Sequence, residues 1–496
     1  MTLFKTDKIV CRTLGGVFLL FSALTVLLFI FPIDPDLGWH LKMGEYIFNT
    51  HSAPLYNLFS YTMREYAWAD SYWLTQVVMH LLYKLGGLPV LTGFFSLLGA
   101  VSIFLAGRIK GRKPLTIRVL GILLIFSLLL KATYIGVRPL VISSVFLVIV
   151  WNVLKDFVYK KKVKGLVVLP FIFLLWANIH ADFVAGLLLV FGVLSVESVF
   201  LLCRKISGVG RNLFFLFCAF LLSVIATFVN PYKAFLWKTL LKETNSLQFK
   251  HIAEWGVPSD KYPHLFYLYL LILCVTFIIL WYKRKHLRWS ETLAIFMVGL
   301  LSVRFSYAIR PFALLSLGLW IRYFNFETFL GKRLSLPPNK SKFVKSLFWF
   351  YGISLVIYVL YTFVATVSLL LSEDKVLEKG GYPVSAITFI KKEKYSGNIF
   401  NDYGWGGFLI WKYQESKTFV DGRMPSWFVG EKSAFADYID ISLVRINAGE
   451  LIRDYKIDYF LIKKNSQLAK ALELNNFWEK TYSDDISAVY KRTAKW

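Results

Sequence analysis

The most regular feature of the chain is a series of apolar runs, each about 10–25 residues long, separated by short polar segments. Such runs are typical of membrane-crossing helices, because about 20 apolar residues in a helix span the hydrocarbon core of a bilayer. Eleven runs are found, at residues 15–31, 88–106, 119–130, 140–153, 166–176, 184–202, 213–229, 265–281, 293–303, 312–321 and 347–371. The pattern predicts a polytopic α-helical membrane protein with about 11 transmembrane helices.

The segment 71–87 is also apolar, but polar side chains interrupt it at Gln76, His80 and Lys84. A helix with such a mixed face is typical of the membrane surface rather than of the bilayer interior. We therefore expect 71–87 to lie at the interface and not to cross.

Basic residues gather in five of the polar segments, at 108–113, 155–164, 203–211, 282–288 and 331–345. Loops rich in Lys and Arg face the cytoplasm, and all five do so together if 71–87 does not cross. Lys5, Lys8 and Arg12 precede the first run and no small-residue cleavage site follows it, which predicts an uncleaved signal anchor with a cytoplasmic N-terminus. Residues 372–496 then lie on the extracytoplasmic side of the cytoplasmic (inner) membrane.

The hydrophobic pattern changes after residue 371. Short strand-like pieces at 397–400, 417–420 and 457–462 alternate with helix-like stretches at 384–394 and 466–476. This pattern predicts a small C-terminal extracytoplasmic α/β domain at 372–496. It would follow a transmembrane domain at 1–371 whose first external loop spans 33–87.

The composition agrees with a membrane protein, since 56% of the 496 residues are hydrophobic and 18% are aromatic. The formal net charge of +26 also suits nucleic acid, but the basic residues lie in the short loops and form no stripe with aromatic residues between them. Membrane topology explains the charge better, and we expect no nucleic-acid partner. The four cysteines show no CxxC spacing, so no disulfide framework or zinc site is indicated.

Two carboxylates stand at the start of the first external loop, in the stretch Asp34-Pro35-Asp36, and His40 follows. One interpretation is structural, because Asp before Pro starts turns and Asp36 is well placed to cap a helix over 41–49. The other is chemical, because paired carboxylates bind a divalent cation such as Mg or Mn, or act as a general base. The position directly after a membrane crossing favours the second interpretation.

Further ionisable residues stand at the predicted external helix ends: Arg138, His180, Asp182, Arg304 and Arg310. Such residues at membrane depth are costly and commonly line a cavity or pathway. Asp182 equally suits a turn that caps the next helix, and arginines near helix ends commonly extend to the membrane surface. Three arginines on one face also suit a phosphate group.

Two stretches of the tail, 401–407 and 421–423, have the composition of tight turns after strands. In the second, Asp421-Gly422-Arg423, we expect an ion pair between the acidic and the basic side chain.

These motifs together resemble a known group of proteins. They are Asp34-Pro35-Asp36 with Trp39-His40-Leu41, Gly44 and Ile47, then Trp68 and Trp73-Leu74, Arg138-Pro139, Trp176-Ala177-Asn178 with His180, Arg304 with Arg310, Phe400-Asn401-Asp402-Tyr403 with Gly406-Gly407, and Asp421-Gly422-Arg423. The chain resembles bacterial members of the GT-C superfamily of membrane glycosyltransferases. The resemblance runs from the first predicted helix to the tail.

The resemblance implies a function. In that superfamily an acidic residue or pair in the first external loop serves catalysis or metal binding, and the sugar donor is linked to a lipid phosphate. By this likeness Asp34 and Asp36 are the acidic pair, and 71–87 is the interfacial helix beside them. The chain has Asp70-Ser71 where relatives of the group carry His-Glu, and Ala181-Asp182 after His180 where they carry glycine, so the likeness does not identify a second carboxylate.

Two hypotheses follow. The first is an inverting glycosyltransferase that moves a sugar from a polyprenyl-phosphate donor to an envelope lipid, glycan or protein; Asp36 or Asp34 would be the base or hold a metal, and Arg138, Arg304, Arg310, His40, His180 and Asp182 would bind substrate. The alternative is a transporter or non-catalytic scaffold for envelope polysaccharide. The absence of repeated halves with broken helices favours the enzyme.

Overall fold

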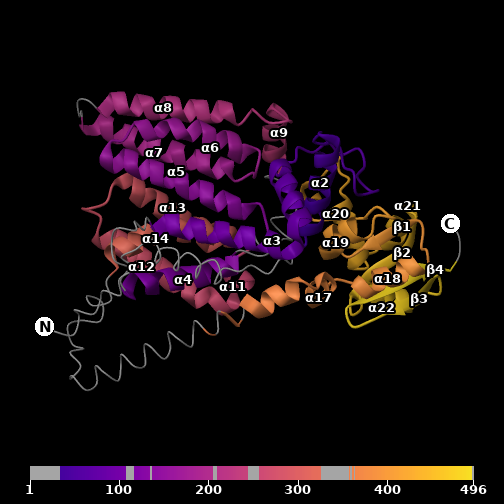
Figure 1. Ribbon diagram of the computed structural model, residues 1–496. Helices are drawn as coiled ribbons and strands as arrows, with labels where there is room; N and C mark the ends of the chain where they lie inside the picture. Colours follow the sequence, from indigo (N-terminus) through magenta and orange to yellow (C-terminus); the bar gives the residue numbers. More distant parts are fainter. Residues whose placement is uncertain are drawn as a thin grey trace, which may run out of the picture.

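The structure is a computed structural model, and it describes residues 34–107, 117–133, 137–204, 209–243, 256–324, 357, 360–361 and 363–493. A bundle of long helices occupies one end of the molecule, and a smaller unit that contains a sheet occupies the other (Figure 1). The predicted helix 15–31, most of 347–371 and the basic segments 108–113 and 331–345 lie outside the described residues.

The bundle consists of helices that match the apolar runs. Within the described ranges, the nine runs from 88–106 to 312–321 fall on α3 (Trp73–Gly107), α4 (Ile117–Thr133), α5 (Leu140–Lys160), α6 (Val168–Ala177), α7 (Phe183–Arg204), α8 (Val209–Ala226), α12 (Phe266–Tyr282), α13 (Trp289–Arg304) and α14 (Ile309–Tyr323). The helices α3, α5, α7 and α12 are long and apolar enough to cross a membrane, and α4, α6 and α8 contain shorter apolar helices. The chain is therefore a helical membrane protein.

The connections between these helices contain short elements. They are η1 (Lys164–Val167), α9 (Ala234–Glu243), α11 (Pro258–Lys261), η3 (Pro263–Leu265) and η4 (Ser306–Ala308).

Helix α3 is two helical segments joined at a kink. Gly86 and Gly87 have non-helical backbone angles, and φ of Gly87 is +62°, a region that favours glycine. Residues 73–85 therefore form a segment of their own before the apolar part of α3 begins. Thr75, Gln76 and Met79 of this segment are buried, whereas Leu85 is exposed. This two-sided character agrees with the mixed pattern of 71–87.

Two of the predicted basic segments meet at one end of the bundle. The hydroxyl of Tyr159 donates to the carboxylate of Glu291, and the backbone N–H of Arg288 donates to the Tyr159 hydroxyl at 3.1 Å. The segments 155–164 and 282–288 therefore lie together, at the end of the bundle farther from the tail (Figure 1).

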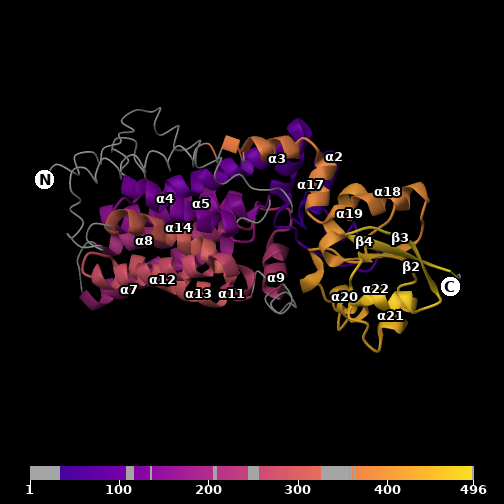
Figure 2. The same cartoon turned by 90° about the horizontal axis from the view of Figure 1, so that it is seen from below.

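The tail is built on a four-stranded mixed sheet with the order β1-β2-β4-β3, in which β1 and β2 are parallel and the other neighbours are antiparallel. Its elements are α17 (Glu373–Lys379), α18 (Val384–Lys392), β1 (Asn398–Asn401), η5 (Tyr403–Trp405), α19 (Gly406–Lys412), η6 (Met424–Ser426), α20 (Ala434–Ser442), α21 (Ala448–Asp454), β2 (Ile457–Lys463), α22 (Gln467–Glu473), β3 (Trp478–Ser483) and β4 (Ser487–Arg492). Helix α18 covers one face of the sheet, and α20, α21 and α22 lie on the other (Figure 2).

The apolar sequence of strand β2 follows from its position, because both of its faces are covered. Tyr459 and Leu461 belong to one hydrophobic cluster, and Phe460 and Ile462 belong to the other. Successive side chains of a strand point to opposite faces, so a strand covered on both faces is apolar throughout.

The predicted strand at 417–420 is wrong. Thr418 forms an isolated bridge with Ser60 of the first loop and is not part of the sheet. The N–H of Thr418 donates to the carbonyl oxygen of Phe59 at 3.0 Å, and the N–H of Tyr61 donates to the carbonyl oxygen of Thr418 at 3.2 Å. This segment therefore joins the tail to the first loop.

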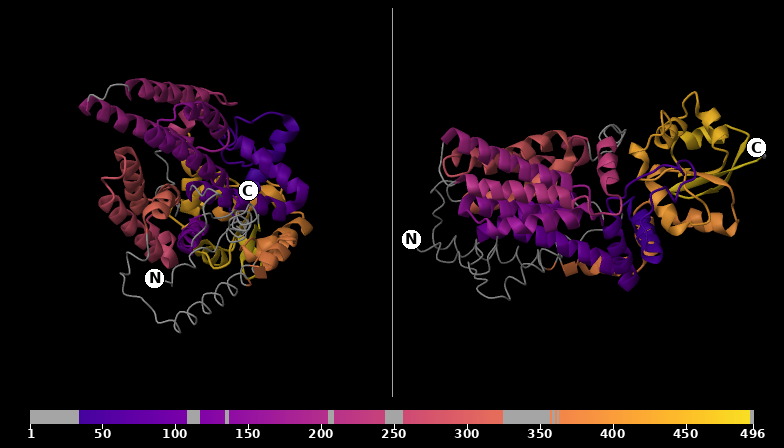
Figure 3. Two further views of the ribbon diagram at one scale, coloured as in Figure 1. Left: turned by 60° about the vertical axis from the view of Figure 1, so that its left-hand side comes forward. Right: turned by 90° about the horizontal axis from the view of Figure 1, so that it is seen from above.

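Helix α2 (Leu37–Thr50), which is part of the first loop, lies between the bundle and the tail (Figure 3). A Cβ atom at Gly38 would lie 2.0 Å from the carbonyl oxygen of Gly407 in α19, and a Cβ atom at Gly44 would lie 2.0 Å from the carbonyl oxygen of Gln76 in α3. No carbon atom fits at these distances. Both helix contacts therefore require glycine.

We expect Gly38→Ala and Gly44→Ala each to destabilise the fold by about 1–3 kcal/mol, because the added methyl group forces two backbones apart. Gly192→Ala in α7 is the matched control: a Cβ atom there meets nothing within 4 Å, and alanine favours a helix. Thermal unfolding of the purified protein in detergent measures the difference. Equal melting temperatures for Gly38→Ala and Gly192→Ala would contradict the close contact.

Candidate functional site

Asp34 shapes the turn that leads into α2. Its Oδ1 accepts a hydrogen bond from the backbone N–H of Asp36 at 2.7 Å, as aspartate does at turns. Asp36 stands at the N-cap position of α2, but its side chain makes no cap hydrogen bond. The interpretation of Asp36 as a capping residue is therefore wrong, and its carboxylate faces other groups.

Arg138, one residue before Pro139 at the start of α5, joins the two carboxylates. Its Nε forms an ion pair with Oδ2 of Asp34, and its Nη2 lies 3.5 Å from Oδ2 of Asp36. The side chain of Asp34 is fully buried, whereas that of Asp36 is 25% exposed. The structure thus brings together three residues that the sequence singled out, and Asp36 is the more accessible of the two acids.

Burial and the neighbouring arginine act in opposite directions on Asp34. Loss of water raises its pKa to about 7, although the positive charge of Arg138 lowers it and the negative charge of Asp36 raises it further. A carboxyl group with such a pKa changes its charge near neutral pH.

Two further groups contact Asp36. The indole Nε1 of Trp39 donates a hydrogen bond to Oδ1 of Asp36 at 3.0 Å. The backbone of Gly422, in the tail, lies so close that a Cβ atom there would be 1.9 Å from the same oxygen. The sequence had given Trp39 and Gly422 no role at the site, since only the fold brings 422 beside 36.

A small polar recess lies beside Arg138. Its lining residues are Thr133, Arg138, Leu140, Tyr262, Ser306, Tyr307 and Arg310. Two of the predicted phosphate-binding arginines, Arg138 and Arg310, therefore face one recess, and the two tyrosines were missed by the sequence analysis.

Asp182 holds Arg310 in place. Oδ2 of Asp182 lies 3.2 Å from Nη2 of Arg310, and the hydroxyl of Tyr307 donates to Oδ1. Burial opposes the ionisation of Asp182, but His180, Arg310 and Tyr307 together lower its pKa to about 2. Asp182 is therefore ionised near neutral pH. The spacing of Tyr307 and Arg310 on one helical face is the signal that could have revealed Tyr307.

Arg304 does not join the other arginines. It is exposed at the end of α13, and its guanidinium group lies 5.0 Å from the centre of the Phe305 ring. It does not line the polar recess. The short helix η4 between Arg304 and Arg310 separates the two side chains.

A series of tilted and edge-on ring contacts connects the first loop with His180. The ring of His40 lies 3.7 Å from that of Trp39 and 5.5 Å from that of Tyr72, which in turn lies 5.2 Å from that of His180. Burial and the positive charge of Arg138 lower the pKa of His40 well below its usual value. The imidazole is therefore neutral, and the amide nitrogen of Gln76 lies 3.2 Å from its Nδ1.

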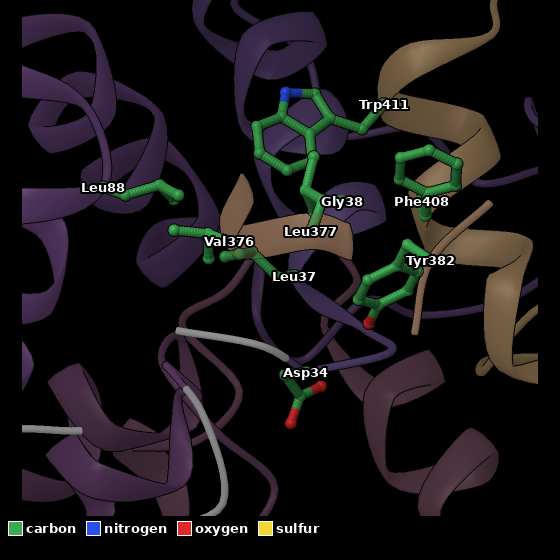
Figure 4. A pocket seen from close by; sticks show the side chains of 9 residues that line it. All are labelled: Asp34, Leu37, Gly38, Leu88, Val376, Leu377, Tyr382, Phe408 and Trp411. Atoms are coloured by element: carbon green, nitrogen blue, oxygen red, sulfur yellow. The ribbon is translucent and has the colours of Figure 1, made fainter. Parts of the chain in front are cut away.

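A second small recess is lined by Asp34 (Figure 4). Its remaining lining residues are mostly apolar: Leu37, Gly38, Leu88, Val376, Leu377, Tyr382, Phe408 and Trp411. Burial and the charge of Asp34 raise the pKa of Tyr382, so its hydroxyl stays protonated beside the acid. The Asp34–Arg138 pair thus borders an apolar recess and a polar one.

The Asp421–Arg423 ion pair predicted from the sequence is present. Nε and Nη2 of Arg423 each lie 2.7 Å from a carboxylate oxygen of Asp421. At the other predicted turn, the N–H of Gly404 donates to Oδ1 of Asp402 at 3.0 Å.

The acidic pair does not fit a divalent cation in this arrangement, because Arg138 contacts both carboxylates. Among the described residues, no group of three or more His, Cys, Asp or Glu side chains has the geometry of a metal site. The positive charge beside the two acids is that of Arg138.

The comparisons with known proteins identify the fold. No protein-family model matches the chain, and no curated protein matches it by sequence. Two crystal structures of ArnT from Cupriavidus metallidurans match almost the whole chain. The structure bound to undecaprenyl phosphate has a TM-score of 0.52 at 14% identity, with 96% of this chain and 98% of that chain covered. The apo structure has a TM-score of 0.53 at 14% identity, with 96% and 97% covered. The chain therefore has the ArnT fold.

The raised pKa of Asp34 gives a pH dependence with a defined sign. Because the folded pKa of about 7 exceeds the unfolded value of 3.8, Asp34 contributes stability that is full below pH 3.8 and is lost as the pH rises through about 7. Asp34→Asn stays neutral, so the melting temperature of the wild type should fall relative to that of the variant between roughly pH 4 and 7. If the melting temperature of the wild type instead rises relative to that of the variant over this range, the attraction of Asp34 to Arg138 outweighs the effect of burial.

Proposed function

We propose that the protein is a GT-C-type glycosyltransferase that transfers a sugar from a polyprenyl-phosphate donor to an acceptor of the bacterial cell envelope. The ArnT fold supports this proposal, since one ArnT structure is bound to undecaprenyl phosphate and ArnT is a glycosyltransferase of this type. The acceptor class, whether lipid, glycan or protein, stays open in the proposal.

The observation that carries the proposal is that the Asp34–Arg138–Asp36 cluster borders two different recesses, one lined by Asp34 and the other by Arg138. A lipid-phosphate donor has an apolar chain and an anionic head, and its reaction needs a base near the phosphate. The polar recess offers two guanidinium groups, and the apolar recess offers a surface for an apolar part of a substrate. The cluster joins the two.

The residues then have separate roles. Arg138 and Arg310 bind the phosphate and stabilise the charge that grows on it as the sugar–phosphate bond breaks. Asp36, the more exposed acid, takes the proton of the acceptor hydroxyl as that oxygen attacks the anomeric carbon. Asp34, whose two oxygens contact Arg138 and the backbone of Asp36, holds the arginine in position.

A single displacement of this kind inverts the configuration at the anomeric carbon. The polyprenyl phosphate is the leaving group and is released. In the proposal, the positive charge of Arg138 compensates the acidic pair, so no divalent cation is required for that purpose. His40 and His180 support the site through the tilted and edge-on ring contacts, and Asp182 supports it through its ion pair with Arg310.

The proposal places the site on the extracytoplasmic face of the inner membrane, with the N-terminus in the cytoplasm and the tail outside. The basic segments 155–164 and 282–288 lie at the opposite end of the bundle from the site, as loops that face the cytoplasm do. Trp281, Tyr282 and Trp289 are exposed near the same end, which is typical of a membrane interface.

Binding of undecaprenyl phosphate to the purified protein in nanodiscs tests the proposal. Arg138→Lys and Arg310→Lys keep the charge opposite the buried acids but lose the paired nitrogens, so each should weaken binding about tenfold or more. Native mass spectrometry or thermophoresis measures the affinity, with undecaprenol as the control lipid.

Arg304→Lys is the control variant, because Arg304 lies outside the polar recess. Its affinity should stay within about twofold of the wild type. An equal loss in Arg304→Lys, or equal binding of undecaprenol and its phosphate, would contradict the assignment of the recess.

A further inference from the structure

The tail reaches the acidic pair through the turn Asp421-Gly422-Arg423. A Cβ atom at Gly422 would lie 1.9 Å from Oδ1 of Asp36 and 3.6 Å from Nε1 of Trp39. The backbone of the tail therefore lies against the carboxylate of Asp36, and a side chain at position 422 would also come near the indole nitrogen of Trp39. Residues almost four hundred positions apart in the chain share this point.

The turn is held firmly in that place. The side chain of Arg423 is fully buried, and it bonds to Asp421 through two nitrogens and to Oδ1 of Asn57 at 3.1 Å. The N–H of Arg423 also donates to Oδ1 of Asp421 at 3.1 Å. Asn57 belongs to the first loop, so the loop and the tail fix the turn together.

Aromatic rings surround the same guanidinium group. Its central carbon lies 5.8 Å from the ring of Trp39, 5.9 Å from that of Trp68 and 5.2 Å from that of Trp427. A guanidinium over aromatic faces is attracted to them, most strongly when water is excluded. Trp39 thus contacts Arg423 with its ring and Asp36 with its N–H.

We propose that Gly422 and Trp39 are positioning residues for Asp36, so that the tail is a working part of the active site. Trp39 and Gly422 restrain one oxygen of Asp36, and Arg138 faces the other at 3.5 Å. The carboxylate is thereby held in one orientation toward the arginine. The positioning itself is a contact that stands without any substrate; its use in catalysis rests on the proposed role of Asp36.

A contact of this kind predicts an effect that depends on Asp36. In Gly422→Ala the methyl group must push the carboxylate away from Trp39, and the Trp39 hydrogen bond weakens. In Asp36→Ala the carboxylate is absent, so the same methyl group has nothing to displace. Gly449→Ala, in α21 of the tail, is the control, because a Cβ atom there meets nothing within 4 Å.

The experiment records the indole N–H resonance of Trp39 in the full-length protein labelled with ¹⁵N-tryptophan, assigned with Trp39→Phe. The resonance should move in Gly422→Ala toward its position in Asp36→Ala, and it should stay in place in Gly449→Ala. Gly422→Ala added to Asp36→Ala should cause a much smaller shift than in the wild type, because the methyl group then only neighbours the indole nitrogen at about 3.6 Å and displaces no carboxylate. An unmoved resonance in Gly422→Ala, or an equally large shift when Gly422→Ala is added to Asp36→Ala, would overturn the proposal.

Melting temperatures provide a second measurement. Gly422→Ala should lower the melting temperature by roughly 2–5 °C in the wild type and by much less in the Asp36→Ala background. If Gly422→Ala alone does not fold, recovery of folded protein in the double variant supports the contact, and failure to recover overturns it.

Undecaprenyl phosphate separates this inference from the proposed function. Its addition should shift the Trp39 resonance of the wild type if the phosphate binds beside Arg138. If the effect of Gly422→Ala on the Trp39 resonance depends on Asp36 but the lipid has no effect, the positioning role stands and the proposed lipid site is contradicted. If the lipid shifts the resonance but the effect of Gly422→Ala does not depend on Asp36, the lipid site is supported and the positioning role is contradicted.

Discussion

The buried contact of Arg138 with Asp34 and Asp36 is the interaction on which the rest of the site depends. Removing three charged groups from water is costly, and a buried ion pair seldom repays that cost in stability. It persists here because the groups compensate one another: Asp34 is fully buried against Arg138, and Asp36 keeps partial contact with solvent. The same contact fixes the first loop to the start of α5 and borders an apolar recess and a polar one.

Close backbone contacts keep this cluster in place. Gly38 and Gly44 let α2 approach α19 and α3, and Gly422 brings the tail onto Asp36. The hydrogen bonds of Thr418 to the first loop and the bond of Arg423 to Asn57 add to the same junction. The loop and the tail therefore behave as one structure around the acids, and a change in either is expected to move the other.

The sequence predicted the parts of the fold that depend on local patterns. Apolar runs became helices because length and hydrophobicity decide between a helix and a strand, and β2 was recognisable because both its faces are covered. The segment 417–420 has the same local pattern as a strand, but it pairs only with the loop at Ser60. Whether such a segment joins a sheet depends on residues far away in the sequence, and these cannot be read from the local pattern.

The same limit applies to the site. The motifs identified Asp34, Asp36, Arg138, Asp182 and Arg310 as candidate site residues, since ionisable groups at membrane depth are costly and commonly line a cavity or pathway. Which acid pairs with which arginine depends on how α5, α7 and α14 pack. Arg304 shows this most clearly, because it is exposed at the end of α13, whereas Arg310, six residues later, lines the polar recess.

The most direct test is an experimental structure of the protein in nanodiscs with undecaprenyl phosphate. The account predicts that the phosphate lies in the polar recess, within hydrogen-bond distance of the guanidinium groups of Arg138 and Arg310, with Asp36 beside it. A phosphate bound away from both arginines, with the recess left to other groups, would contradict the central claim.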